Sequence, residues 1–506
     1  MKIQTFLFKM IKMNKLKYIV LPLLVLSISS CGTNTDTSSI APSSEGESSE
    51  SITSSETSTS VEESSSATPI ISKKNPLNEP LIANQYYLNH IGDIYNTWKD
   101  YQGHGQTIAV IDVGFKYDHP DFVYEDGTSK VSDKSAYFST KGTSTTTQVG
   151  TKYLSNTISA HGYNNDHGTF CAGVAAAGIN KKGVIGVAPL AELLLLRTDG
   201  QAPSINEAFK YAADYGARVV SISIGSYANY DGDLNYDNSP KANLKTVFND
   251  AVAYCKEKGT VVISAAGNGG NSTSTYPGDS KDVIGVGGLK ANESSVIWPE
   301  SSYNPSNSKT FCEVFAPSDG MYGCCEYNAS KYDGGLNDDG SQKWVGTSFA
   351  APIVAGIAAL YFEKNPNNSV DDFVTDLTTK AAVSFTPKAS TGYGRVDVGK
   401  LLGSTLTGNV TVNAKDSEQL YAYCWNSITG AKEKAWPGTK CTASGNNYTY
   451  TVDASKYDSI IFNNGGEPAA QTVSLLASSF ISGNVYDTSS PTLFGENTYI
   501  GSYIKN

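Results

Sequence analysis

The chain has 506 residues, of which 39% are hydrophobic and 17% are charged, and 38 basic against 49 acidic residues leave a formal net charge of −11. This length allows roughly two to four domains, and the apolar content suffices for at least one large core, which excludes global disorder. Because no basic surplus exists to neutralise phosphates, nucleic acid is excluded as a partner. Eight cysteines are too few for a fold built on disulfides.

Residues 1–30 have the features of a signal peptide and are not expected to belong to the fold. A lysine-rich stretch is followed by an apolar run at 18–28, then by small residues and Cys31. The tetrapeptide that ends at Cys31 resembles the bacterial lipobox. That resemblance implies cleavage before Cys31, acylation of this cysteine and anchoring by the lipid, since each buried CH₂ contributes about 0.8 kcal/mol. The alternative is an ordinary secretory signal with a chance cysteine.

Residues 31–72 are predicted to be the lipidated cysteine and a disordered tether. The stretch 33–68 is dominated by Ser and Thr, carries seven acidic residues and has no Lys or Arg. So little apolar surface cannot offset the entropy lost when a backbone is ordered, and the like charges extend the chain. We therefore expect an exported protein that is lipid-anchored at the bacterial cell membrane or surface and touches the membrane through its lipid only.

Residues 73–403 have the pattern of an α/β domain. Five short apolar runs, which suit strands buried on both faces of a parallel sheet, alternate with helical stretches at 204–215 and 244–258. This alternation predicts a doubly wound, mostly parallel sheet that binds its ligand beyond the carboxyl ends of the strands. The apolar runs lie at 107–112, 192–197, 218–224, 260–266 and 282–287.

Four motifs in this part carry chemistry. Asp112 ends the first buried strand, His167 opens a small-residue helix, Asn268 follows a later strand, and Ser348 opens an apolar helix in which Pro352 is expected to be a tolerable first-turn residue. A serine hydroxyl needs an adjacent base to become a nucleophile, and imidazole titrates near neutrality. A buried carboxylate would fix the tautomer of the imidazole and stabilise its protonated form.

These motifs, in the order Asp, His, Ser, resemble the subtilase family of serine peptidases over roughly 76–402. The resemblance implies a subtilisin-like fold, a catalytic set of Asp112, His167 and Ser348, and an oxyanion hole formed by the Asn268 side chain and the Ser348 N–H. It also implies two chain edges that pair with an extended peptide by strand addition. Those edges contain Ser223, Gly225, Ala265 and Gly267.

Some features of this part depart from the family or leave alternatives open. The family usually has Ser or Thr after the catalytic acid, where this chain has Val113; we expect a modest change in rate or pH profile and not inactivity. The polar stretch 123–160 is predicted to be an insertion beside the site. No cofactor is expected for the chemistry, and the His and Cys spacing of a zinc site is absent. Structural calcium, which many subtilases use, stays open at 231–237 and 333–339, where a solvated loop is the alternative.

The cysteines give no unique disulfide pattern. Cys171, four residues after His167, is predicted to be a small core residue on the same helix face. Other cysteines could pair outside the cytoplasm, and their connectivity stays open. The pairings considered are Cys312 with Cys324 or Cys325, and Cys424 with Cys441.

Residues 404–506 are predicted to form a small all-β sandwich, because short alternating runs are separated by many turn signals. A Tyr-x-Tyr-x-Trp run, a Trp-Pro-Gly segment and an Ile-Ile-Phe-Asn-Asn-Gly segment resemble family 26 starch-binding modules. This resemblance implies a starch-like α-glucan as partner. By that likeness the sugar-binding residues are Tyr421, Tyr423, Trp425, Trp436, Asn464 and Gln471. The alternative is that the first three aromatic side chains face the sandwich core.

Together these features predict a surface-anchored serine endopeptidase that hydrolyses protein or peptide substrates through an acyl-enzyme and is targeted to starch-like glucan. The alternative is a non-catalytic glucan-binding surface lipoprotein on a peptidase scaffold. The presence of Asp112, His167 and Ser348 together favours the enzyme.

Overall fold

The computed structural model describes the chain from residue 76 onward, with gaps. Contacts divide the chain into two units, Met1–Thr68 and Pro69–Asn506. The signal peptide, Cys31 and the tether lie outside the described residues. Among the residues that are described, no helix is both long and apolar enough to cross a membrane. The described residues are 76, 79–141, 144–155, 165–227, 241–270, 272, 275–291, 295–304, 311–328, 331–334, 344–383, 392–403, 408–413, 419–426, 431–445, 447–453, 456–457, 459–465, 475–476, 485–493 and 499–504.

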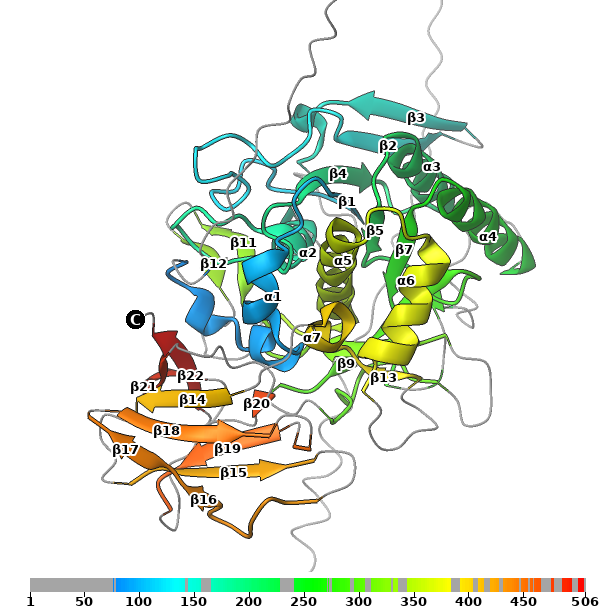
Figure 1. The fold of residues 1–506 in the computed structure, drawn as a ribbon. Coiled ribbons are helices and arrows are strands. Elements are labelled where there is room, and N and C mark those ends of the chain that lie inside the picture. Colours follow the sequence, from blue (N-terminus) through cyan, green and yellow to red (C-terminus); the bar gives the residue numbers. More distant parts are fainter. Residues whose placement is uncertain are drawn as a thin grey trace, which may run out of the picture. The chain divides into compact units, whose positions relative to one another are not determined.

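The α/β part is built around a nine-stranded sheet (Figure 1). Its strands are β1 (Thr107–Asp112), β2 (Ala136–Lys141), β3 (Ser144–Val149), β4 (Glu192–Thr198), β5 (Val219–Ile222), β7 (Val261–Ala265), β9 (Val283–Leu289), β10 (Val314–Pro317) and β13 (Gly394–Arg395). Their order is β13-β10-β9-β7-β5-β1-β4-β2-β3, and every neighbouring pair is parallel except β2 with β3. This confirms the predicted doubly wound, mostly parallel sheet.

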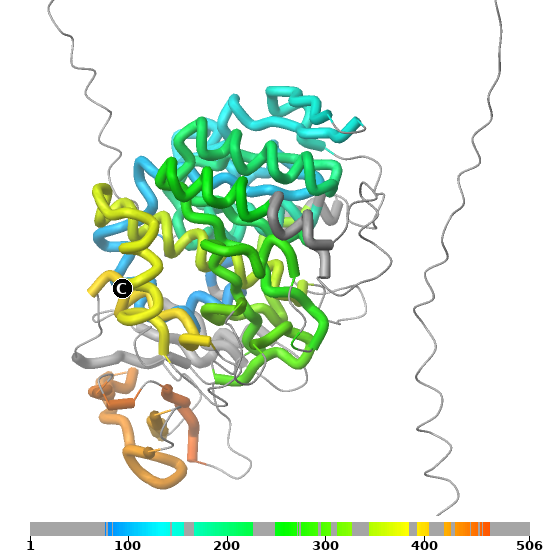
Figure 2. The backbone as a smooth tube through the Cα atoms, turned by 90° about the vertical axis from the view of Figure 1, so that its right-hand side faces the viewer, coloured from blue at the N-terminus to red at the C-terminus, as the bar shows by residue number. Residues whose placement is uncertain are grey.

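Helices cover both faces of this sheet (Figures 1 and 2). The four main ones are α2 (Asn165–Ala176), α3 (Ala202–Asp214), α4 (Lys241–Glu257) and α5 (Thr347–Lys364). Successive residues of β1 point to opposite faces: Ile108 and Val110 share a core with α2 and α5, whereas Ala109 and Ile111 share another with α3 and α4. Burial on both faces explains why the strands read as continuous apolar runs.

Shorter elements complete the α/β part. The helices are η2 (Ile82–Asn84), η3 (Tyr86–His90), α1 (Ile94–Asp100), η4 (Thr151–Tyr153), α6 (Val370–Asp376), the π-helix η5 (Leu377–Ala381) and α7 (Val398–Leu402). Two-stranded ribbons are formed by β6 (Ser226–Tyr227) with β8 (Thr275–Tyr276), and by β11 (Gly323–Asn328) with β12 (Lys331–Gly334).

The stretch 123–160, for which the sequence predicts a polar insertion, contains the hairpin β2-β3. This hairpin extends the sheet beyond β4, with β2 parallel to β4. Ala136 and Phe138 of β2 are buried and alternate with more exposed residues. The alternation of buried and exposed residues that marks a strand is therefore present in the sequence, but only over a few residues. Arg197 on β4 holds the chain after the hairpin, because its guanidinium donates to the carbonyls of Tyr153 (3.0 Å) and Ser155 (2.8 Å).

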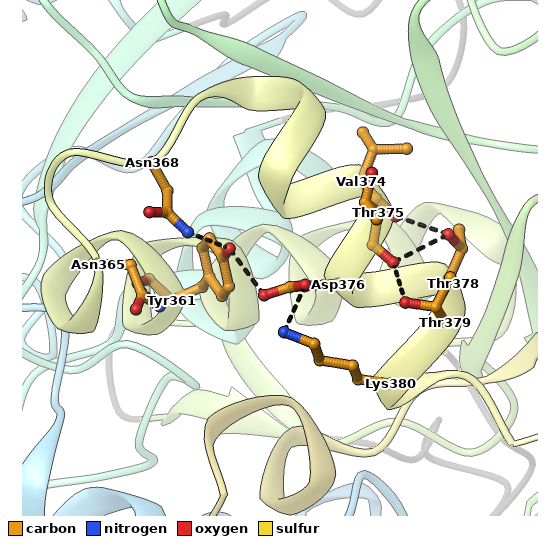
Figure 3. Close-up of polar contacts among 9 residues, drawn as sticks. All are labelled: Tyr361, Asn365, Asn368, Val374, Thr375, Asp376, Thr378, Thr379 and Lys380. Carbon is orange, nitrogen blue, oxygen red and sulfur yellow. Dashed lines mark hydrogen bonds and ion pairs between the residues drawn. The ribbon is translucent and has the colours of Figure 1, made fainter.

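The far end of α5 is fixed by polar contacts with α6 (Figure 3). The Tyr361 hydroxyl donates to Asp376 Oδ2 (3.0 Å) and accepts from Asn368 Nδ2 (2.7 Å). Asp376 also pairs with Lys380, one turn further along, at 2.6 Å. The helix that begins near Ser348 is therefore tied down at its other end as well.

Replacing Tyr361 by Phe is expected to lower the free energy of unfolding by about 1–2 kcal/mol, because two hydrogen bonds are lost and Asp376 and Asn368 each lose a partner. The hydroxyl lies about 20 Å from Ser348 along the helix at 1.5 Å per residue, so kcat should stay unchanged. Urea denaturation and a peptide-hydrolysis assay measure the two quantities. Unchanged stability, or a reduced kcat, would contradict this account of the contact.

The C-terminal part contains two β-sheets, as the alternating runs predict. Its strands are β14 (Gly408–Asn413), β15 (Tyr421–Trp425), β16 (Thr439–Lys440), β17 (Thr442–Ser444), β18 (Asn447–Val452), β19 (Ser459–Asn463), β20 (Leu475–Leu476), β21 (Val485–Leu493) and β22 (Tyr499–Ile504). One sheet has the order β17-β18-β14-β21-β22 and the other β16-β15-β19-β20. Buried side chains of β18 on one sheet and of β15 and β19 on the other form its core, which confirms a small all-β sandwich.

The seven cysteines among the described residues are present as buried thiols. The disulfides that the sequence leaves open are therefore absent from this part of the chain. Cys171 is buried in the core, as predicted.

Candidate active site

Asp112, His167 and Ser348 come from three elements that meet at the carboxyl edge of the central sheet. Asp112 is the last residue of β1, His167 the third of α2, and Ser348 the second of α5. Gly168 permits α2 to approach β1 closely: a Cβ at this position would lie 2.3 Å from the Gly114 carbonyl oxygen and 2.9 Å from Asp112 Cβ. Gly168, which follows His167 in the motif, is therefore needed for the close packing of α2 against the end of β1.

Asp112 and His167 form a buried pair. Asp112 Oδ2 lies 2.8 Å from His167 Nδ1, and Oδ1 accepts the Val113 backbone N–H, also at 2.8 Å. Because a carboxylate only accepts, the proton is on Nδ1 and Nε2 is left as an acceptor. Burial alone would lower the pKa of His167, but the charge of Asp112 and the hydrogen bond to it raise this pKa above its ordinary value.

Ser348 lies at the N-terminus of α5, where the backbone carries a partial positive charge. Its Oγ donates to the carbonyl oxygen of Ser223 (3.3 Å), and its own carbonyl accepts from Ser223 Oγ (2.7 Å) and Cys171 Sγ (3.4 Å). Because α5 begins at Thr347, Pro352 is its sixth residue. The expectation that this proline lies in the first turn is therefore wrong.

Asn268 is held by the residue that precedes Ser348. Its Oδ1 accepts from both the backbone N–H (2.9 Å) and the Oγ1 hydroxyl (2.8 Å) of Thr347, whose Oγ1 accepts in turn from the Gly267 N–H (3.1 Å). With Oδ1 fixed in this way, the amide Nδ2 lies toward Gly346, 3.3 Å from where a Cβ would stand. The sequence does not single out Thr347, because no local pattern links it to a residue almost eighty positions earlier.

The four residues expected to line the substrate edges lie after two neighbouring strands. Ser223 and Gly225 follow β5, and Ala265 and Gly267 end and follow β7, which pairs with β5. A Cβ at Gly225 would lie 2.4 Å from the carbonyl oxygen of Tyr276, so only glycine allows this approach. The structure brings these residues to the edge of the sheet that also carries Asp112.

An aromatic cluster that the sequence does not mark supports the site. The ring of Phe170 lies 4.6 Å from Trp344 and 4.7 Å from Phe349, and Phe349 lies 5.7 Å from His167, centroid to centroid. These rings pack the start of α2 against the start of α5. Aromatic residues far apart in sequence carry no spacing signal, so only the fold reveals the cluster.

Two groups of potential metal ligands occur among the described residues, and neither fits a calcium ion, which takes six to eight oxygen ligands. They are Asp112 with His167 and Cys171, and His119 with Asp121 and Cys324. In the second group His119 Nδ1 accepts the Asp121 backbone N–H (3.1 Å), which puts the ring proton on Nε2. Of the acidic stretches considered for calcium, 231–237 and 335–339 lie outside the described residues.

The aromatic residues of β15 lie on the face of the strand that points away from the sandwich core. Tyr421, Tyr423 and Trp425 are half-buried, whereas the two residues that alternate with them are fully buried. The alternative in which these three aromatics face the core is therefore wrong. The Tyr423 ring lies 5.5 Å from Trp425 and 5.4 Å from Trp436, whose side chain is 41% exposed.

Of the two amides of the predicted sugar site, one is among the described residues. Asn464 is exposed directly after β19, next to Gly465, whose N–H donates to Asn463 Oδ1 (3.0 Å). Gln471 lies outside the described residues.

Comparison with known proteins gives two family matches and several relatives. Residues 103–395 match the model of the Subtilase family, and residues 412–475 match Starch-binding module 26. A thermophilic serine proteinase of Bacillus sp. (strain AK1) is 32% identical over 295 residues, covering 56% of this chain and 60% of that protein. Thermitase of Thermoactinomyces vulgaris is 30% identical over 289 residues, covering 56% of this chain and 84% of thermitase.

Among solved structures, fervidolysin from Fervidobacterium pennivorans, described as a keratinolytic enzyme related to subtilisin, matches with a TM-score of 0.49 and 20% identity. The match covers 85% of this chain and 59% of that one. The Subtilase match spans more than half of the chain and contains the Asp112–His167 pair and Asn268 together with Ser348. The chain belongs to the subtilase family of serine endopeptidases and has a match to a starch-binding module in its C-terminal part.

Proposed function

We propose that the chain cleaves peptide bonds of protein substrates through Asp112, His167 and Ser348, by way of an acyl-enzyme. The observation that supports this best is the buried 2.8 Å contact between Asp112 and His167 beside the first turn of α5. For attack, the Ser348 hydroxyl turns from the Ser223 carbonyl toward Nε2 of His167, which takes its proton and later gives it to the leaving amine. Asp112 holds the imidazole and stabilises its charged form.

The negative charge that develops on the substrate carbonyl oxygen would be held by Asn268 Nδ2 and the Ser348 N–H. Thr347 fixes the amide of Asn268 through two hydrogen bonds, so this donor needs no reorganisation during the reaction. Loss of one such donor costs about 2.7–4 kcal/mol of transition-state stabilisation, a magnitude that comes from subtilisin, a member of the same family. The N-terminus of α5 adds its partial positive charge.

A fluorophosphonate that reacts only with activated serines tests this proposal. We expect it to abolish hydrolysis of an unstructured protein such as casein, and peptide mapping should place the adduct on Ser348. A folded protein that neither hydrolyses casein nor becomes labelled would reject the proposal and favour the non-catalytic alternative. An adduct on another serine would reject the assignment of the nucleophile.

We further propose that the C-terminal part binds starch-like α-glucan on the aromatic face formed by Tyr423, Trp425 and Trp436. Three rings at 5.4–5.5 Å spacing, one of them well exposed, offer an apolar surface on which sugar rings can stack. Tyr421, Asn464 and Gln471 would contribute further contacts. Binding there would concentrate the peptidase on glucan-associated protein or fix it near the cell envelope.

Replacing Trp436 by Ala is expected to weaken binding to amylose by about tenfold or more, since removing a ring that becomes buried on binding costs at least ~1.4 kcal/mol. Pull-down on amylose, followed by affinity electrophoresis, measures the change. Tyr393→Ala, which removes an aromatic ring of similar exposure from the α/β part (48% against 41% for Trp436), is the matched control and should bind as the wild type does. Equal retention of both variants would reject the aromatic face as the binding site.

The lipid anchor, the location at the bacterial cell membrane or surface, and structural calcium stay proposals that depend on the sequence and the family. Mass spectrometry of the N-terminal peptide would reveal a lipid on Cys31, and an unmodified peptide that begins elsewhere would reject the anchor. Thermal unfolding with and without a calcium chelator tests the metal.

A further inference from the structure

The carbonyl of Ser348 lacks the donor that an α-helix normally supplies. In a helix, the carbonyl of each residue accepts the N–H of the residue four positions later. The residue four positions after Ser348 in α5 is Pro352, which has no N–H. The backbone of the candidate nucleophile is therefore deprived of its helical hydrogen bond by a proline one turn away.

Two side chains from other elements donate to this carbonyl instead. Ser223 Oγ lies 2.7 Å from the Ser348 carbonyl oxygen, which is the most common length for an O–H···O hydrogen bond. Cys171 Sγ, on α2, lies 3.4 Å from the same oxygen, and a thiol is only a weak donor. Of the two, Ser223 makes the stronger contact.

Ser223 also meets Ser348 through its backbone. The Ser348 hydroxyl donates to the Ser223 carbonyl oxygen at 3.3 Å, which is long for an O–H···O hydrogen bond. The contact to the Ser348 backbone is thus the short one, and the contact to its reactive hydroxyl is the weak one. This difference holds the main chain of Ser348 in place while its Oγ stays able to turn about one side-chain bond.

We propose that the hydroxyl of Ser223 is a positioning element of the active site, which replaces the N–H that Pro352 lacks and fixes the backbone of Ser348. This inference rests on the proposed peptidase activity and gives Ser223 a second role beside its expected place on a substrate edge. Through Ser348 it also sets the position of the Ser348 N–H, one of the two oxyanion donors. Its effect should therefore fall on the chemical step and not on substrate binding.

Replacing Ser223 by Ala is expected to lower kcat by about 10–100-fold with KM changed less than about threefold, because a nucleophile misplaced by ~1 Å costs about 10²-fold. Ser223→Thr keeps the hydroxyl and should recover most of the loss. The acid limb of the pH profile should not move, since His167 keeps its contact with Asp112. A change mainly in KM would show that Ser223 acts only as a substrate contact and would overturn the inference.

Ser221→Ala is the matched control. Ser221 lies two residues earlier on β5, is fully buried, and within the described part of the chain its Oγ has no hydrogen-bond partner. Removing that hydroxyl should leave kcat unchanged. A loss equal to that of Ser223→Ala would attribute both effects to packing of the strand and would count against the positioning role.

A double-mutant cycle with Pro352→Ala gives the sharpest test, because alanine restores an N–H that can donate to the Ser348 carbonyl. Ser223→Ala should then cost several-fold less in the Pro352→Ala background than in the wild type. Additive losses would overturn the inference. If Ser223→Ala does not fold, as judged by thermal unfolding, the pair Ser223→Thr and Ser223→Val, which differ by one hydroxyl, replaces it in the cycle.

Failure of the proposed role of Ser223 can be distinguished from failure of the proposed peptidase function. If the wild type reacts with the fluorophosphonate at Ser348 and the cycle is additive, only the role of Ser223 is rejected. If the wild type neither reacts nor hydrolyses casein, the peptidase proposal fails first.

Discussion

Replacing Ser348 by Ala is expected to lower kcat by about 10⁶-fold, a size that comes from the same kind of exchange in subtilisin, a member of this family. The substitution removes Oγ alone. The backbone contacts of residue 348, with Ser223 Oγ and Cys171 Sγ as donors to its carbonyl, remain possible. The Asn268 amide stays fixed by Thr347, so a residual acceleration of about 10³-fold over water should survive.

Hydrolysis of a fluorogenic peptide, measured with enough enzyme to detect the residual rate, tests this expectation. Thermal unfolding should occur at the wild-type temperature, because the hydrogen bond that Ser348 Oγ makes within the described part of the chain, to Ser223, is long. Adding His167→Ala to Ser348→Ala should lower the rate little further, since the two residues act as a unit. More than a few per cent of wild-type activity in purified Ser348→Ala would mean that another group is the nucleophile.

The positions of the candidate catalytic residues could be predicted because each lies where an element begins or ends. Asp112 ends an apolar run that reads as a buried strand, and His167 and Ser348 open stretches rich in small residues. In a parallel sheet the carboxyl ends of strands and the N-termini of the following helices come to one edge. Local patterns are therefore enough to place these groups near one another.

The supporting contacts could not be predicted, because they depend on how distant elements are positioned against each other. Thr347 meets Asn268 only because the start of α5 lies beside the end of β7, and Ser223 meets Ser348 only because β5 ends beside the same turn. No periodic pattern in the sequence predicts that Thr347 lies beside Asn268 or that Ser223 lies beside Ser348. The side chain that replaces the N–H that Pro352 cannot donate to the Ser348 carbonyl was also beyond the sequence.

The C-terminal sandwich shows a different limit. A period of two along 421–425 establishes that the strand has two faces but does not say which face is buried. The aromatic residues are the larger set and would remove more area from water if they were buried, which favours the core, yet the structure buries the small residues between them. Ala422 and Cys424 stand opposite Phe462 and Ile460 of β19, whose large buried side chains fill the core on this face, and the rings of β15 are left on the outer face.

Replacing Asp112 by Asn is expected to lower kcat by about 10⁴-fold near neutral pH. The new Oδ1 can still accept the Val113 N–H, so the side chain keeps its anchor and its amide NH₂ faces His167. An N–H donor at that position forces Nδ1 of His167 to accept and moves the ring proton to Nε2. Nε2 can then no longer take a proton from Ser348.

The pH dependence supplies a second readout with a definite sign. In the wild type, the charge of Asp112 and the hydrogen bond to it raise the pKa of His167, so activity should fall with decreasing pH, as His167 becomes protonated, at a pH above the ordinary imidazole range. In Asp112→Asn that cause is removed, burial lowers the pKa of His167, and the acid limb should move to lower pH while the plateau drops. The raised pKa of His167 also affects the free energy of unfolding. The contact of protonated His167 with Asp112 stabilises the fold below the ordinary pKa of histidine, and this contribution is lost as the pH rises through the raised pKa of His167.

A matched control separates the loss of a catalytic carboxylate from the loss of any buried one. Asp93 is fully buried and caps α1 by accepting from the Asn96 backbone N–H (3.3 Å) and side chain (2.8 Å), so Asp93→Asn should change thermal stability and leave kcat and the acid limb in place. If Asp112→Asn behaves in the same way, Asp112 is only a capping acid at the end of a strand. Asp and Asn at position 112 can both accept the Val113 N–H, so this contact does not distinguish them. A large fall in kcat with a shifted acid limb is therefore possible only if the carboxylate of Asp112 acts on the imidazole of His167.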